Sequence, residues 1–173
     1  MLRPTGTAGS ASAVSHRRPA DVAALGGARR IIGTVTLECA FCDWLAADSP
    51  TRVYEDDATF AEIDPRQPHQ GHVLVMPARH VETVFALDPE TSAAVMQTTV
   101  RVANAVRDAF RPDGLSLWQS NGPGAHQEVP HFHMHVMPRW TGDDLLRIYP
   151  GKVETPTVAT RVEMAERIRR CLE

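Results

Sequence analysis

The sequence predicts an α+β fold in which short strands are combined with one long helix. Three observations predict it. Short runs rich in Val, Ile, Thr and Phe are typical of strands, one long stretch carries the start and stop signals of a helix, and no internal repeat divides the chain.

Length and composition bound the class of protein. A chain of 173 residues has a normal size for one domain and is short for two. Hydrophobic residues make up 43% and charged residues 23%, which excludes full-length disorder, a coiled coil and collagen. The net charge of −3 argues against a dedicated nucleic-acid binder, and no run approaches the roughly 18 apolar residues of a membrane span. We therefore expect neither nucleic acid nor a membrane as a partner.

The first 33 residues differ from the rest of the chain. They are rich in Ala, Gly, Ser and Arg, contain one acid, Asp21, and show neither helical nor strand periodicity. We expect residues 1–33 to form a disordered extension and residues 34–173 to form the domain. A transit peptide is the alternative, because the segment is rich in arginine and nearly free of acids. Three cysteines do not make a disulfide framework, so we expect a cytoplasmic location.

Five segments are predicted to be strands. The strongest is His72–Met76, which Pro77 stops. The loop at 121–130 contains Gly122 and Gly124 and leads into the last strand. The other four predicted strands are Thr51–Tyr54, Thr59–Ile63, Leu115–Ser120 and His131–Pro138.

Two helices are predicted. The long helix begins at Asp88-Pro89, where a capping side chain precedes a proline at the first helical position, and it runs to about Phe110. A shorter amphipathic helix is predicted from Val158 to Leu172. The apolar residues that fall near one face of the long helix are Met96, Val100, Ala103 and Phe110.

A row of histidines is the most informative feature of the sequence. In the run His131-Phe132-His133-Met134-His135-Val136, histidines alternate with apolar residues. On a strand, this period of two places the three imidazoles on one face and the apolar side chains on the core face. The plainer alternative is a strand whose solvent-facing positions happen to be histidine.

The spacing argues against one metal ion bound by all three histidines. The outer two lie about 13 Å apart on a strand, whereas zinc–nitrogen bonds are about 2.0–2.1 Å. Covalent chemistry is the alternative, because a neutral imidazole attacks phosphorus without a separate base and the phosphoramidate that it forms is labile. Glycines in the preceding loop would let backbone N–H groups approach phosphate oxygens closely.

The segment His131–Met137 resembles the signature of the histidine triad (HIT) family, in which three histidines alternate with apolar residues. The resemblance includes Asn121-Gly122, Gln127–Pro130 and Gly71–His80, and it covers residues 37–142. It implies a HIT-like fold with an antiparallel sheet, and a homodimer.

The resemblance also implies the roles of individual residues. In this family the middle histidine, here His133, attacks the α-phosphorus of a nucleotide conjugate, and water then hydrolyses the nucleotidyl–histidine intermediate. His135 would contact the phosphate and the leaving-group oxygen, and Asp64 would accept hydrogen bonds from the ribose hydroxyls. The other implied binding residues are His72, which would orient the triad, and Asn121, Gly122 and Gln127, which would hold the phosphate.

Three positions bear on how this chain differs within the family. His135 is similar to the hydrolase branches, because transferase relatives have glutamine there. Glu62 stands where an apolar or aromatic residue near the base is common. His126 stands where glycine is usual. The last two affect the base preference and the shape of the loop.

Cys39 and Cys42 have the spacing of half a structural zinc site. Alone, they could equally be two small buried residues or a redox pair. Many bacterial members of the HIT family complete such a pair with two histidines, which the resemblance places at His80 and His131. The implied Cys2His2 set is closed and leaves no position for an activated water, so the Zn²⁺ would be structural.

The resemblance therefore implies a nucleotide hydrolase. Its expected substrate is a purine conjugate, with adenosine as the nucleoside: a phosphoramidate, a dinucleoside polyphosphate, or an adenylated amine or sulfate. The alternatives are a nucleotide-binding or sensing protein with little turnover, a nucleotidyl transferase, and a metallohydrolase that uses zinc-bound water.

Overall fold

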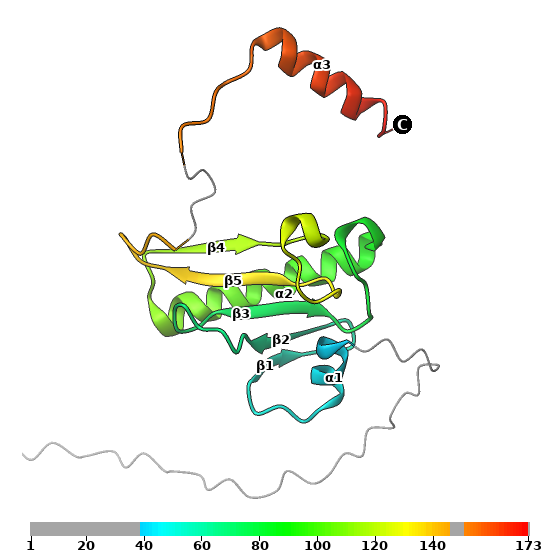
Figure 1. Cartoon of the computed structure of the whole chain (residues 1–173). Coiled ribbons are helices and arrows are strands. Elements are labelled where there is room, and N and C mark those ends of the chain that lie inside the picture. Colours follow the sequence, from blue (N-terminus) through cyan, green and yellow to red (C-terminus); the bar gives the residue numbers. More distant parts are fainter. Residues whose placement is uncertain (1–38, 146–150, 173) are drawn as a thin grey trace, which may run out of the picture. The chain divides into compact units, whose positions relative to one another are not determined.

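The computed structural model describes residues 39–145 and 151–172, and contains a five-stranded antiparallel sheet (Figure 1). The strands lie in the order β1-β2-β3-β5-β4, and every neighbouring pair is antiparallel. The predicted α+β class is confirmed, and the predicted extension at 1–33 lies outside the described residues. The strands are β1 (Arg52–Glu55), β2 (Thr59–Ile63), β3 (Val73–Pro77), β4 (Gly114–Trp118) and β5 (Met134–Arg139).

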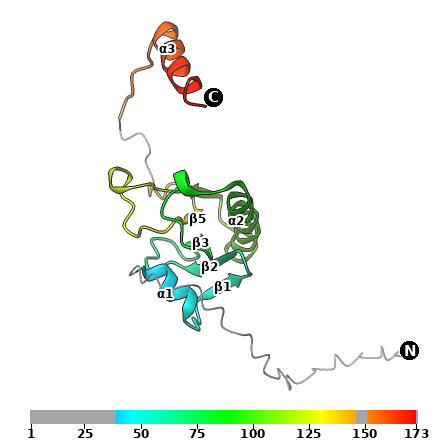
Figure 2. The same cartoon turned by 90° about the vertical axis from the view of Figure 1, so that its right-hand side faces the viewer.

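Helix α2 (Pro89–Phe110) has the predicted bounds and covers one face of the sheet, as the view along the helix shows (Figure 2). The Asp88 side chain accepts a hydrogen bond from the Thr91 N–H at 2.7 Å, which caps the first turn. The helix ends at Arg111, whose left-handed φ of 49° stops the regular repeat.

The buried face of α2 is not the one that the apolar residues predict. Met96 and Val100 are 48% and 52% exposed, because a neighbouring face of the helix packs against the sheet instead. Two threonines fill this face without unpaired hydroxyls: Thr98 bonds Thr59 of β2 at 2.8 Å, and Thr99 donates to a main-chain oxygen of its own helix. The buried residues of α2 are Val95, Thr98, Thr99, Val102 and Val106.

The sheet has a hydrophobic core on each face. Val73 and Val75 of β3 face α2, whereas Leu74 and Met76 face helix α1 (Ala40–Ala46). Successive strand residues point to opposite faces, so β3, buried on both, is central. The predicted core-facing Phe132 and Val136 belong to the α2 side, and Met134 packs against it.

Strand β5 begins at Met134, so the prediction of a strand from His131 was wrong at its start. Only His135 of the three triad histidines lies within the strand. The His131 N–H donates to the Val129 oxygen at 2.8 Å and the Phe132 N–H to the Val81 oxygen at 2.5 Å, outside the β3–β5 ladder. The three imidazoles are therefore not held in one straight row.

The remaining elements are short helices. Residues Val84–Ala86 and Pro123–Ala125 form single 3-10 turns. Helix α3 (Val158–Arg169) confirms the second predicted helix, and the Thr157 side chain caps it by accepting from the Thr160 N–H at 3.2 Å. Among the described residues, no helix is both long and apolar enough to cross a bilayer. The cytoplasmic location remains a prediction from the sequence.

Candidate functional site

A pocket of about 550 Å³ opens on the face of the sheet opposite α2. Its volume is within the usual range of small-molecule sites, roughly 300–1,000 Å³. Four of the predicted catalytic and binding residues line it: Asp64, His72, His133 and His135.

His133 has one ring nitrogen fixed and one available. Its Nδ1 lies 2.7 Å from the main-chain oxygen of His131. Because a carbonyl oxygen can only accept, Nδ1 carries the proton and the neutral ring keeps its lone pair on Nε2. Burial lowers the pKa of His133, whose side chain packs edge-on against Phe41. At neutral pH the ring is therefore uncharged, and its Nε2 lone pair is available in the wall of the pocket.

His135 belongs to a chain of hydrogen bonds that runs from the Arg66 main-chain oxygen through His72. The Nδ1–H of His72 donates to the Arg66 main-chain oxygen at 3.1 Å, and Asp64 Oδ2 lies 3.4 Å from the same nitrogen. His72 Nε2 must then accept from His135 Nδ1–H at 2.9 Å. The second nitrogen of His135, Nε2, is left for the pocket.

Trp118 covers these two imidazoles. Its indole stacks on His135 with ring centroids 4.2 Å apart and an interplanar angle of 4°, and on His72 at 5.5 Å. Burial under this cover lowers the pKa of His135 to about 3, and burial also lowers the pKa of His72. Trp118 was not among the predicted site residues, although it lies directly opposite His135 in the β4–β5 register.

Asp64 lines the pocket and is 1% exposed. Its Oδ1 accepts from the Arg66 N–H at 2.7 Å. Its Oδ2 is buried and has no hydrogen-bond donor among the described residues. Since buried carboxylate oxygens are nearly always bonded, Oδ2 is a ready acceptor for a ligand hydroxyl.

Asn121, Gly122 and Gln127 are not among the residues that line the pocket. They hold the loop together instead. Gln127 accepts from the Gly122 N–H and donates to the Glu82 oxygen, each at 2.7 Å. Asn121 accepts from the Val84 N–H at 2.7 Å. The loop residues that do reach the pocket are Ala125, His126, Glu128 and Val129.

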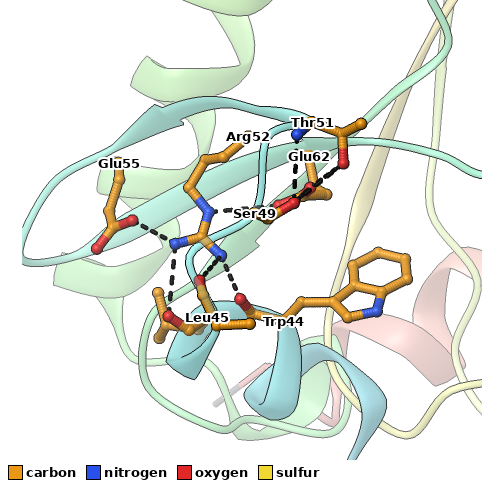
Figure 3. Close-up of polar contacts among 8 residues, drawn as sticks. Trp44, Leu45, Ser49, Thr51, Arg52, Glu55 and Glu62 are labelled. Atoms are coloured by element: carbon orange, nitrogen blue, oxygen red, sulfur yellow. Dashed lines mark hydrogen bonds and ion pairs between the residues drawn. The ribbon is translucent and has the colours of Figure 1, made fainter.

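The two departures from the family pattern have structural explanations. His126 has a φ of 59°, a left-handed conformation that glycine adopts with the least strain. Glu62 is 3% exposed but does not line the pocket. It accepts from Ser49 and from Thr51, the latter at 2.5 Å, and pairs with Arg52 Nε at 3.3 Å (Figure 3).

Arg52 links Glu62 to helix α1. Its guanidinium donates to main-chain oxygens at the end of this helix, where the unpaired carbonyls favour a cation (Figure 3). Glu62 is therefore part of an anchor for α1, the helix that contains Phe41 and Cys42. The three accepting oxygens are those of Trp44, Leu45 and Ala47.

A separate cluster contains Cys39, Cys42, His80 and His131, whose donor atoms all lie within 4.8 Å of one another. Three of the sulfur–nitrogen separations are 3.4, 3.5 and 3.6 Å. Zinc bonds of about 2.3 Å to sulfur and about 2.0–2.1 Å to nitrogen, at tetrahedral angles, place these atoms about 3.6 Å apart. The donor set could therefore hold a tetrahedral metal ion.

The protonation states of His131 and Cys42 determine how this cluster could bind a cation. His131 Nε2–H donates to the Pro77 oxygen at 2.9 Å, so the Nδ1 lone pair points toward the sulfurs. Burial, with smaller contributions from Cys39, raises the pKa of the Cys42 thiol to about 12. The Cys42 thiolate therefore forms when a cation arrives and displaces the proton.

Comparison with known proteins identifies relatives of the chain. The HIT domain model matches residues 48–142. The chain is 39% identical over 107 residues to Protein hit of Bacillus subtilis, an overlap that covers 61% of this chain and 74% of that protein. It is 31% identical over 121 residues to Adenylylsulfatase HINT3 of Arabidopsis thaliana, covering 66% of this chain and 61% of that protein.

A solved structure has the same fold. The crystal structure of a zinc-bound histidine triad family protein from Mycobacterium smegmatis matches with a TM-score of 0.58 at 36% identity. The match covers 65% of this chain and 84% of that chain.

Proposed function

Because this chain belongs to the HIT domain family, we propose that it is a nucleotide hydrolase acting through a covalent nucleotidyl–histidine intermediate on His133. One observation carries the proposal. The hydrogen bond from His133 Nδ1–H to the His131 oxygen leaves a nucleophilic Nε2 in a pocket large enough for a nucleotide.

The reaction consists of two displacements. First, His133 Nε2 forms a bond to the α-phosphorus, and the bond from phosphorus to the leaving group breaks with its electron pair going to the leaving atom. The charge of the bound phosphate stabilises the imidazolium form of His135, which gives its Nε2 proton to that atom. Second, water attacks the phosphorus, the P–N bond breaks, and a proton returns to His135 as the nucleoside monophosphate departs.

The nucleoside is held at the inner end of the pocket. Asp64 Oδ2, buried and without a donor from the described ranges 39–145 and 151–172, accepts from the ribose hydroxyls of a purine nucleoside, with adenosine the expected one. His72 orients His135 through their shared hydrogen bond. Asn121, Gly122 and Gln127 fix the shape of the loop on the phosphate side, and direct contact between them and the phosphate remains a prediction.

The metal cluster has a structural role in this proposal. Cys39, Cys42, His80 and His131 would hold Zn²⁺, and the zinc-bound relative supports that choice of metal. With four protein ligands, the ion would supply a cross-link rather than an activated water. His131 also offers the main-chain oxygen that orients His133, so a fixed His131 fixes the nucleophile.

We also propose a homodimer formed through β4 and the adjoining side of α2. Within the described part of the chain, β4 is an edge strand that pairs only with β5. Leu117 of β4 is 47% exposed, and Met96 and Val100 of α2 are about half exposed as well. Leu117→Asp is expected to yield monomers in sedimentation velocity, and an unchanged oligomer would contradict this interface.

A turnover panel tests the function. Adenosine 5′-phosphoramidate, adenosine 5′-phosphosulfate and diadenosine tetraphosphate are offered to the full chain, with the His133→Asn variant as the blank. We expect release of AMP from at least one substrate and none with the variant. Binding without turnover of all three would favour a nucleotide sensor. Turnover that survives in the variant would favour a metallohydrolase.

A further inference from the structure

An ion pair joins two loops of the pocket wall. Arg66 Nη1 lies 2.7 Å from Glu128 Oε2, and both residues line the pocket. Arg66 belongs to the loop between β2 and β3, and Glu128 to the loop that precedes the histidine row. Their side chains are 67% and 68% exposed, whereas Asp64 and His133 are 1% and 6% exposed. The pair therefore lies at the mouth of the pocket.

Arg66 is the one lysine or arginine among the described residues that line this pocket. Its main-chain N–H is bonded to Asp64 Oδ1 at 2.7 Å, and its Nε lies 3.7 Å from the same oxygen. The side chain thus begins at the proposed ribose acceptor and ends across the mouth. Behind the larger effects of burial and of two neighbouring histidines, its charge also lowers the pKa of His135.

We propose that Arg66 binds an anionic leaving group, a phosphate or a sulfate, and so selects nucleotide conjugates that contain one. This inference rests on the proposed function and names its substrate class. With the ribose at Asp64 and the α-phosphorus at His133, the group attached to that phosphorus extends toward the mouth, where the guanidinium lies. The planar fork of N–H donors matches the oxygens of a tetrahedral oxyanion.

Glu128 holds the guanidinium until such a group arrives. Exposed ion pairs are worth little, because water screens both charges. Exchanging Glu128 for a bound phosphate or sulfate therefore loses little and gains charge-assisted hydrogen bonds. A neutral amine leaving group carries no negative charge that could replace Glu128, so Arg66 keeps its ion pair with Glu128. The mouth thus distinguishes leaving groups by charge.

The test measures binding to full-length protein with His133→Asn, in which no bond is broken. The probes are adenosine 5′-phosphosulfate and adenosine 5′-phosphoramidate, which differ only in the leaving group. Adding Arg66→Met is expected to weaken phosphosulfate binding about tenfold or more, as loss of a charged hydrogen bond does, and to change phosphoramidate binding little. Equal weakening of both probes, or none, would overturn the assignment.

Three further variants separate charge selection from damage to the fold. Arg66→Lys keeps the charge and is expected to recover part of the phosphosulfate affinity. Arg101→Met removes an exposed arginine of α2 that bonds Tyr54, and should change neither affinity. Glu128→Gln frees Arg66 and should tighten phosphosulfate binding; weaker binding would contradict the exchange. Thermal melts confirm that each variant is folded.

The inference and the proposed function can fail separately. Charge selectivity in the His133→Asn background, without AMP release by the unmodified chain, would support Arg66 and contradict the hydrolase. AMP release without charge selectivity would support the hydrolase and overturn the role of Arg66.

Discussion

Two clusters in this protein bring histidines together for different chemistry. Cys39, Cys42, His80 and His131 form one, and Asp64, His72 and His135 form the other, each with its donor atoms within 4.8 Å. The first has two thiols and four donors, enough to close a tetrahedral site. In the second, the two imidazoles already bond each other at 2.9 Å and face the pocket.

The difference is set by main-chain carbonyls. His131 gives its Nε2–H to the Pro77 oxygen and turns Nδ1 toward the sulfurs. His133, two residues on, gives its Nδ1–H to the His131 oxygen and keeps Nε2 for the pocket. The carbonyl that each ring meets selects the tautomer, and the tautomer decides which ring nitrogen keeps its lone pair: the one facing the sulfurs in His131 and the one facing the pocket in His133.

Removal of one thiol should have the largest effect on stability. Cys39→Ser is expected to lose bound zinc and to lower the free energy of unfolding by more than about 4 kcal/mol, because metal binding and folding are coupled. Elemental analysis and denaturant unfolding measure both quantities. Cys171→Ser, at an exposed cysteine, is the matched control and should change neither. Activity that tracks added zinc in a folded, metal-free protein would contradict the structural role.

The anchor of α1 should have an intermediate effect, since this helix contributes Cys42 to one cluster and Phe41 to the pocket. Arg52→Met leaves the carboxylate of Glu62, whose side chain is 4% exposed, without its cation. We expect a loss of about 3 kcal/mol in the free energy of unfolding. The double variant Arg52→Met/Glu62→Leu should recover most of it. An unchanged unfolding midpoint in Arg52→Met would show that the pair does not anchor the helix.

The pocket cluster should show an effect that is spread over the acid range and is smaller per pH unit than the two effects above. The pKa of His135 is lowered by burial to about 3 in the folded chain, against about 6.5 when unfolded. The unfolded chain therefore binds more protons below about pH 6.5, and the free energy of unfolding falls as the pH drops toward 3. This contribution is fully present above about pH 6.5, and its slope reaches about 1.4 kcal/mol per pH unit.

Denaturant unfolding at a series of pH values from 7 down toward about 3 measures how the free energy of unfolding changes with pH. The His135→Gln variant cannot take up the proton, so its slope should be shallower over the same range. Identical slopes in the two proteins would show that His135 is not held neutral in the folded state.

Local signals predicted the elements better than their contacts. Asp88 and Pro89 determine where α2 begins, and the sequence shows both. The prediction of the buried face of α2 was wrong because Thr98 and Thr99 count as polar in a sequence. Inside the fold, both hydroxyls are hydrogen-bonded, so these residues can be buried. The predicted start of the last strand was wrong because the Phe132 N–H donates to the Val81 oxygen instead of to a neighbouring strand of the sheet.

The candidate site likewise contains residues that a local sequence pattern predicts and contacts that depend on the fold. The histidine row and the cysteine pair were visible as spacings, and the structure brings their members together. Arg66 and Glu128 are 62 residues apart in the sequence, so no local pattern announces their contact. Trp118 was missed for a similar reason, since its place over His135 depends on strand register.

Trapping the intermediate tests His133 most directly. The full chain is mixed with the p-nitrophenyl ester of AMP, which has a readily departing leaving group, and is quenched in base within the first turnover. Mass spectrometry of the peptides should find one adenylyl group on His133 and none in the His133→Asn protein. An adduct on another residue, or release of AMP by the variant at the unmodified rate, would contradict His133 as the nucleophile.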